Sequence, residues 1–266
     1  MRIIDLSDTL RPETSPFEVN RHEISYVSHE EGLRMAEQVL KVPKSLEQDL
    51  FPEGHAWAVE NITLSTHSGT HVDAPYHYGP VSGTAPARTI DQLPLEWFFS
   101  DGVVLNMTHK RRGEPIGERD VEKELGRIGY TLKPLDIVLV RTDTSEHFGE
   151  PGYDLMHPGL TRGAVQFLVE QGVRVVGIDA WGLDRPFDVM VEEVKAGRKG
   201  AFWEAHFFGK EHEYCQIEKL SNLKAIPRPF GFKVACFPVK IARASAGWTR
   251  AVAIINDAAS EERPGR

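Results

Sequence analysis

The sequence predicts an α/β fold, and two features support this assignment. Residues 135–143 form a β-branched apolar run, residues 161–171 have helical spacing, and residues 173–179 form a second apolar run. A strand, a helix and a strand in this order are typical of α/β domains. Polar residues also gather where these strands end, which is where such domains bind their ligands.

The length and composition are those of one globular domain. A chain of 266 residues with 41% hydrophobic residues can build a sizeable core, so we expect a single domain over residues 1–266. The polar, charged segments 28–58 and 187–205 are expected to be loops or short helices that cover the core, with a lid as one role for them. Residues 258–266 are expected to form a frayed tail.

The remaining elements follow from local patterns along the chain. Residues 118–128 place Val121, Leu125 and Ile128 at helical spacing, and Gly129 ends this helix. Further buried strands are expected at residues 2–6, 102–106, 232–241 and 249–255, with a turn of small residues between the last two.

Charge and composition exclude some classes of partner. The formal net charge of −8 disfavours nucleic acid and anionic membranes. No apolar run is long enough to cross a bilayer, and the N-terminal stretch with Asp5 and Asp8 lacks the apolar core of a secretory signal, so a cytoplasmic location is expected. Cys215 and Cys236 lie in separate apolar contexts and are expected to be buried thiols rather than a disulfide.

The stretch 59–78 carries a cluster of potential ligands. Ile62 and Leu64 alternate with polar residues, as in a half-buried strand. Gly69 and Pro75 disfavour a helix here, so an extended or looped ribbon is predicted. If the alternation continues, four side chains at odd positions point to one side: His67, His71, Asp73 and His77.

This cluster predicts a metal site with hydrolytic chemistry. Two imidazoles and one carboxylate, from His67, His71 and Asp73, suit zinc, manganese or ferrous iron and leave positions open for water and substrate. Such an ion makes hydroxide available near neutral pH. His77, just beyond the ligands, is the expected proton shuttle to a leaving nitrogen.

The segment from His67 to His77 resembles the signature HxGTHxDxPxH of the cyclase-like metal-dependent hydrolases, a family that includes bacterial kynurenine formamidases and isatin hydrolases. The segments IIDLSDTL, VVGIDAWGLDRPF and FPVKIARASAGWTRAVAI are also similar to the family. The resemblance implies a compact α/β domain with a mixed, curled sheet around the metal site, like a swivelling β/α barrel. It also implies a homodimer or a homotetramer.

The same resemblance extends the ligand set. His206 and Glu218, in HFFGKEHEYCQIEKLSNL, match a family element and are implied to complete the metal site. The cofactor would be Mn²⁺ or Zn²⁺, as one ion or as two ions bridged by Asp73.

Several functions remain open within this resemblance. The chain length and the segments GIDAWGLDRPF, EKLSNL and ASAGWTRAVAI look closer to the isatin hydrolases, which implies opening of a small cyclic aromatic amide by metal-bound hydroxide. The alternatives are an arylformamidase acting on N-formylkynurenine, a lyase or cyclase acting on a carbonyl compound, and a degenerate relative that only binds metal or ligand. Retention of His77 argues against the last of these.

Four further residues are candidates for supporting roles. Trp181 could form a flat wall for an aromatic substrate, or it could pack in the core. Arg185 could receive a product carboxylate, or it could form a surface ion pair. Asp179 and Asp184 could orient ligand histidines, or they could cap the following turn.

Overall fold

The computed structural model describes residues 1–18, 21–41 and 43–256, and it divides into two compact units. Residues 1–10 together with the chain from residue 66 onward form an α/β unit, and residues 11–65 form a second unit, here called the arm. The tail predicted at residues 258–266 lies outside the described residues.

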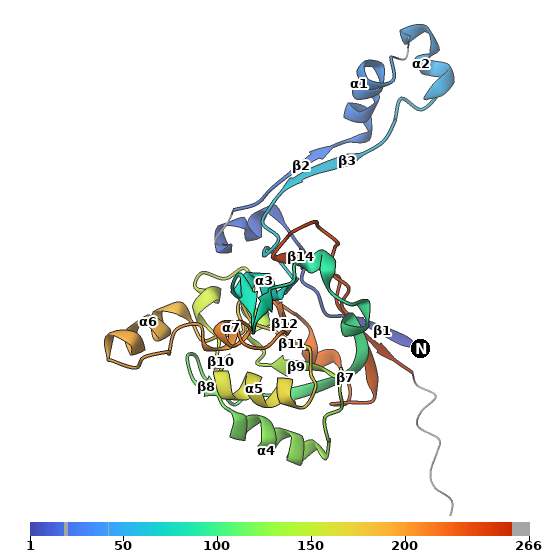
Figure 1. Ribbon diagram of the computed structural model, residues 1–266. Helices are drawn as coiled ribbons and strands as arrows, with labels where there is room; N and C mark the ends of the chain where they lie inside the picture. The colour runs from blue at the N-terminus through green and yellow to red at the C-terminus, as the bar shows by residue number, and fades with distance from the viewer. Residues whose placement is uncertain (19–20, 42, 257–266) are drawn as a thin grey trace, which may run out of the picture. The chain divides into compact units, whose positions relative to one another are not determined.

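The α/β unit is built on a nine-stranded mixed sheet (Figure 1). Strands β7, β9, β11 and β12 run parallel to one another, and every other pairing in the sheet is antiparallel. The predicted α/β class with a mixed, curled sheet is therefore confirmed. In order across the sheet, the strands are β1 (Arg2–Asp5), β15 (Val252–Ile255), β13 (Phe232–Ala235), β7 (Phe99–Asn106), β9 (Ile137–Arg141), β11 (Val175–Ile178), β12 (Cys215–Glu218), β4 (His71–Asp73) and β14 (Ala246–Trp248).

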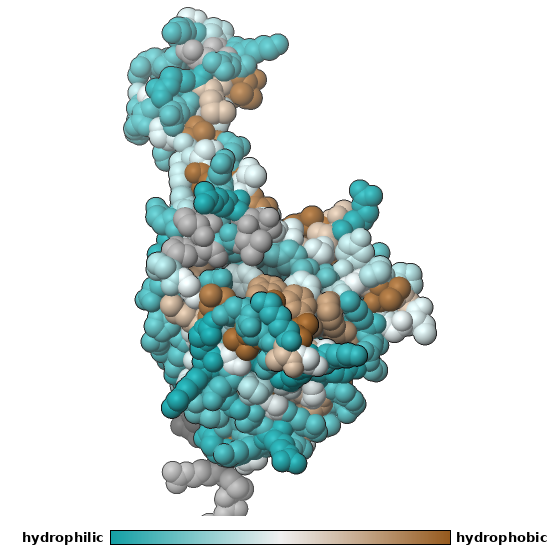
Figure 2. Space-filling view, turned by 90° about the vertical axis from the view of Figure 1, so that its left-hand side faces the viewer, coloured by the Kyte–Doolittle hydropathy of each residue, from teal (hydrophilic) through white to brown (hydrophobic). Residues whose placement is uncertain are grey.

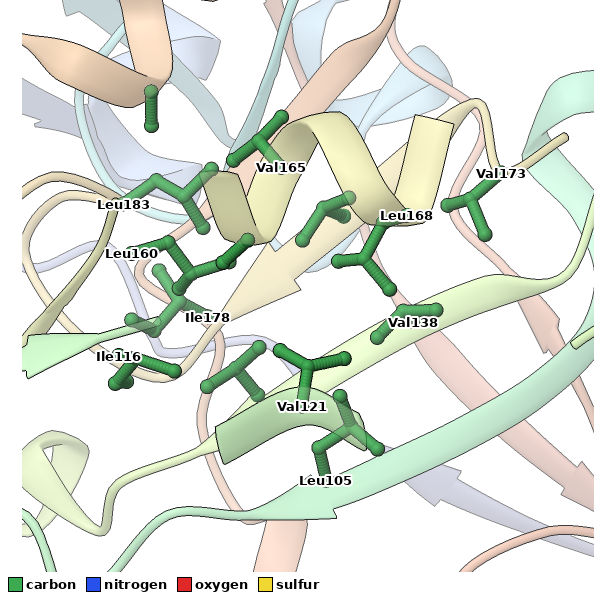
Figure 3. Packing of buried hydrophobic residues seen from close by; sticks show 14 of the residues in the cluster. Leu105, Ile116, Val121, Val138, Leu160, Val165, Leu168, Val173, Ile178 and Leu183 are labelled. Atoms are coloured by element: carbon green, nitrogen blue, oxygen red, sulfur yellow. The ribbon is translucent and has the colours of Figure 1, made fainter. Parts of the chain in front are cut away.

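Apolar side chains cover both faces of the central strands, which explains their continuous apolar sequences. One face packs against α4 (Glu118–Ile128) and α5 (Arg162–Glu170), and Figure 3 shows side chains of these helices pointing toward those of the strands. Alternate residues of the same strands, such as Val104 and Leu139, belong to the core on the other face. Among the residues labelled in Figure 3, the core between the sheet and helices α4 and α5 includes Leu105, Val121, Val138, Val165, Leu168 and Ile178.

Most predicted elements are present, but the C-terminal strands differ from the prediction. The helix at 118–128 has the predicted bounds, and Gly129 ends it in the left-handed conformation with φ 68°. The strand predicted at 232–241 stops at Ala235, shortly before Pro238, which has no backbone N–H to donate. Part of the predicted turn is instead strand β14, because these residues pair with β4.

The arm contains the segment 28–58, and short helices are confirmed there. Its elements are η1 (Pro12–Phe17), β2 (Glu23–Val27), α1 (His29–Val39), α2 (Lys44–Leu50) and β3 (Val59–Thr63). Ser28 and Glu31 form a capping box at the start of α1, and β2 pairs with β3. Large apolar side chains are exposed on the arm: Tyr26, Val39, Leu40, Leu46, Leu50 and Ile62. Figure 2 shows hydrophobic residues in brown on the molecular surface.

Short helices also occur in the segment 187–205, as predicted. These are α6 (Phe187–Lys195) and the start of α7 (Glu204–Phe208), while α3 (Pro75–Tyr78) follows β4. No helix among the described residues is long and apolar enough to span a membrane. The remaining elements are β5 (Val81–Ser82), β6 (Ala85–Pro86), η2 (Ile90–Gln92), η3 (Leu95–Phe98), β8 (Pro115–Ile116), η4 (Thr144–His147), η5 (Tyr153–Leu155), β10 (Gly159–Leu160) and η6 (Leu223–Ala225).

Candidate metal centre

Strand β4 places two of the predicted ligands in the middle of the site. It pairs with β12 on one side and β14 on the other, and His71 and Asp73 are buried. The register sets Glu218 of β12 opposite His71, with 3.7 Å between Oε2 and Nε2. Strand pairing therefore brings together two residues that are distant in the sequence.

A tight turn before β4 positions His67. Gly69 has φ +62°, a left-handed conformation that glycine adopts without strain. Nδ1 of His67 lies 2.8 Å from Oδ1 of Asp73, and its Nε2 lies 3.0 Å from Oγ of Ser245. The Gly69 carbonyl accepts a 2.8 Å hydrogen bond from Nδ1 of His71, which leaves the lone pair of His71 Nε2 facing the carboxylates.

His77 reaches the site from a short helix, not from an extended ribbon. The predicted alternation fails beyond β4, because Pro75 occupies the first turn of α3, where a missing N–H costs nothing. The His77 ring centroid lies 4.2 Å from that of His67 and 5.4 Å from that of His206. The predicted convergence of the histidines is therefore present, although the local structure that achieves it differs.

His206 comes from α7 and faces the same carboxylates. Its Nε2 lies 3.9 Å from Oδ2 of Asp73 and 3.8 Å from Oε1 of Glu218. Its Nδ1 lies 2.5 Å from Oδ2 of Asp184, which also accepts hydrogen bonds from the backbone N–H groups of Ala205 and His206. Asp184 therefore orients His206, one of the two roles predicted for it.

The donor set fits a divalent cation. Two groups of donor atoms share Asp73, and the atoms of each group lie within 4.8 Å of one another: His67, Asp73 and His77, and His71, Asp73 and Glu218. Nδ1 of His67 and Nε2 of His71 lie 2.8 and 3.3 Å from Oδ1 of Asp73, but these contacts lack hydrogen-bond geometry. Both carboxylate oxygens of Asp73 and Nε2 of His71 are therefore buried without a hydrogen bond among the described residues. Buried polar atoms seldom stay unpaired, whereas metal ligands are arranged in this way.

The environment of the site shifts the pKa values of its titratable groups in different directions. Burial, opposed by Asp73 and reinforced by the neighbouring histidines, lowers the pKa of His77 to about 4. Burial disfavours the charged form of His206 too, but its hydrogen bond to Asp184 and the nearby carboxylates outweigh this and raise its pKa to about 9. Burial and the charge of Asp73 raise the pKa of Glu218.

The structure places the remaining candidates around this centre. Both amino groups of Arg185 are paired, with Glu193 at 2.6 and 2.7 Å and with Glu204 at 3.2 Å, which favours a structural role. Asp179 accepts hydrogen bonds from Thr142 and from the backbone of the next residue, and so holds a turn rather than a histidine. Trp181 is half-buried, with its ring centroid 5.7 Å from that of Phe187.

Two residues near the centre were missed from the sequence. Trp203 stacks on His206, and Lys219, which follows a predicted ligand, is buried and donates a 2.9 Å hydrogen bond to the carbonyl of His67. Both have positive φ, of 52° and 56°. No sequence pattern signals either one, because each contact depends on long-range packing.

Known proteins with related sequences or structures agree with this description. Residues 4–185 match the family model described as putative cyclase. The kynurenine formamidase of Bacillus thuringiensis (strain Al Hakam) is 27% identical over 130 residues, which are 49% of this chain and 54% of that protein. The chain thus spans about half the length of the curated relatives it matches.

Solved structures resemble the chain over nearly its whole length. An isatin hydrolase bound to the product analogue thioisatinate has a TM-score of 0.73 at 20% identity, covering 95% of this chain and 92% of that one. Isatin hydrolase A from Ralstonia solanacearum has a TM-score of 0.71 at 23% identity, covering 96% and 92%. These likenesses show a shared fold.

The sequence resemblance, the fold and the family match agree. The model matches more than half of the chain and includes the segment from His67 to His77. The chain therefore belongs to the putative cyclase family.

Proposed function

We propose that this protein is a metal-dependent hydrolase that opens a small cyclic amide such as isatin. The observation that carries the proposal is the buried carboxylate of Asp73, which makes no hydrogen bond among the described residues and is surrounded by imidazole and carboxylate donors, with His77 beside them. The likeness in fold to isatin hydrolases over nearly the whole chain supports the ring-amide substrate.

The chain's own residues supply ligands, orientation and proton transfer. His67, His71, Asp73, His206 and Glu218 would hold one or two ions of Mn²⁺ or Zn²⁺. When bound, such an ion would polarise the substrate carbonyl and lower the pKa of a water molecule.

His77 is suited to move the proton. With a pKa of about 4, its imidazole is neutral near pH 7 and can accept a proton from the attacking water. Water adds to the carbonyl carbon, the C–N bond breaks, and His77 delivers that proton to the departing nitrogen. The products are an acid and an amine, with no covalent enzyme intermediate.

An arylformamidase acting on N-formylkynurenine is the second candidate, favoured by the sequence relatives named kynurenine formamidase. Isatin and N-formylkynurenine should be compared with protein loaded separately with Mn²⁺ and Zn²⁺, using the His77→Gln variant as the control. Faster loss of isatin supports the ring-amide proposal, and faster deformylation supports the second candidate. If the protein binds metal but turns over neither compound, the choice of substrates is refuted, and a binding-only relative becomes the better explanation.

We also propose that the protein forms a homodimer or a homotetramer in which the arm packs against a second copy. Helix α2 has no buried residue, and β2 and β3 pair only with each other among the described residues. The exposed apolar side chains of the arm therefore have little cover within the arm itself.

A further inference from the structure

A group of half-buried aromatic side chains adjoins the metal centre through Trp203. We call these five residues the aromatic wall: Trp181, Phe187, Phe202, Trp203 and Phe207. Neighbouring ring centroids in this wall are 5.7 to 5.9 Å apart, within the range of aromatic contact. The wall comes from the strand-to-loop junction after β11 and from the α6–α7 region.

Trp203 joins this wall to two histidines of the candidate metal centre, His77 and His206. Its ring stacks on His206 with centroids 4.6 Å apart and planes 8° from parallel. It also lies 5.9 Å from the ring of His77, at 60°. Trp203 is only half-buried, so part of the residue remains exposed beside these histidines.

The backbone of Trp203 indicates that the indole is there for a reason other than local stability. Its φ of 52° is unusual for a bulky residue, and it occupies the N-cap of α7 without making a side-chain cap. Its N–H donates to the sulfur of Met190, a weak acceptor, at 3.3 Å. Strained positions of this kind cluster at ligand-binding sites.

We propose that Trp203 contacts the substrate and makes the site select a flat ring over a puckered ring of the same size. This inference rests on the proposed hydrolase function and adds the residue that sets its ring specificity. A planar ring can stack on or pack edge-to-face against the indole, whereas a cyclohexyl ring offers no π face. Phe187 packs against the same indole, with ring centroids 5.9 Å apart.

The test uses two formamides that differ only in the ring, formanilide and N-cyclohexylformamide. Their dissociation constants are measured by calorimetry on metal-free and Mn²⁺-loaded protein, and kcat/KM is measured on the loaded protein. The preference for formanilide should fall about 2- to 10-fold in Trp203→Leu, which keeps bulk but loses the π face, and should be retained in Trp203→Phe. Phe237→Ala, which truncates an exposed ring stacked on Phe99, should leave the preference unchanged.

Binding and turnover separate this inference from the proposed function. If the wild type hydrolyses neither formamide but its binding preference falls in Trp203→Leu, Trp203 keeps its role, the formamidase alternative is refuted, and the isatin assay alone decides the ring-amide proposal. If the wild type shows no preference in binding, or if Trp203→Leu weakens both ligands equally, the role of Trp203 is refuted. Thermal unfolding of each variant shows whether an equal loss reflects damage to the fold.

Discussion

Replacing Asp184 by Asn would change the charge that holds His206 while nearly preserving its shape. The carboxylate accepts from Nδ1 of His206 at 2.5 Å and from two backbone N–H groups at the start of α7. An Asn oxygen can keep the backbone contacts, but it cannot stabilise a charged imidazole to the same degree. The substitution therefore isolates the electrostatic part of the interaction.

The expected magnitude follows from the pKa of His206. A pKa of about 9 in the folded protein, against 6.5 for a free histidine, corresponds to about 3 kcal/mol. Because the folded-state value is the higher one, this stabilisation is fully present below pH 6.5 and is lost as the pH rises through about 9. Asp184→Asn should remove most of this pH-dependent stability from the metal-free protein.

Urea unfolding of metal-free protein between pH 6 and pH 10 measures this difference. Asp188→Asn is the matched control, because its carboxylate is exposed and pairs with Arg112 rather than with a histidine. The pKa of His71 is also raised, and His71 therefore adds to the pH dependence of the free energy of unfolding in both proteins. For this reason, only the difference between wild type and variant is interpreted. A free energy of unfolding with the same pH dependence in Asp184→Asn as in the wild type would refute this account of His206.

Three further predictions concern the metal, the base and the arm. Asp73→Asn should abolish binding of Mn²⁺ and Zn²⁺ in dialysed samples, because both candidate donor groups share this carboxylate; retention of the wild-type metal content would contradict the assignment. His77→Gln should keep the metal but lower kcat about 10²- to 10⁴-fold, and wild-type activity should decline as the pH falls toward 4. Metal loss in that variant would show His77 to be a ligand instead. Leu46→Ser combined with Leu50→Ser should reduce the molar mass measured by light scattering, and an unchanged mass would argue against an oligomer formed through α2.

The sequence predicted the parts of the site that lie close together along the chain. Gly69 and the four polar residues of the cluster could be recognised because the local spacing already restricts where their side chains can meet. Even there, the conformation was only partly predicted, since Pro75 starts a helix in place of continuing a ribbon. Local spacing therefore predicts which residues form the cluster better than it predicts the backbone conformation of the segment.

The long-range parts of the site could not be predicted from spacing. Glu218 meets His71 only because β12 pairs with β4 in one particular register, and family resemblance alone indicated Glu218 beforehand. Trp203 depends on the packing of α7 and on an unusual φ that no propensity favours. The arm, residues 11–65, was predicted only in part: the polar, charged segment 28–58 was set apart, but its compactness depends on the pairing of β2 with β3, which local patterns do not specify.

The order of strands in the sheet has a kinetic consequence during synthesis. Strand β1 pairs with β15, so that Arg2 lies opposite Ile255, and β4 pairs with strands that follow it by well over a hundred residues. As the chain leaves the ribosome, β1 and β4 stay unpaired until their partner strands near the C-terminus have been synthesised. Sheets with such long-range pairings fold slowly, and unpaired strand edges promote aggregation. We expect nascent chains that stop before residue 252 to lack the β1–β15 pairing and to remain sensitive to proteases, and the yield of folded protein to depend on chaperones that shield these early strands.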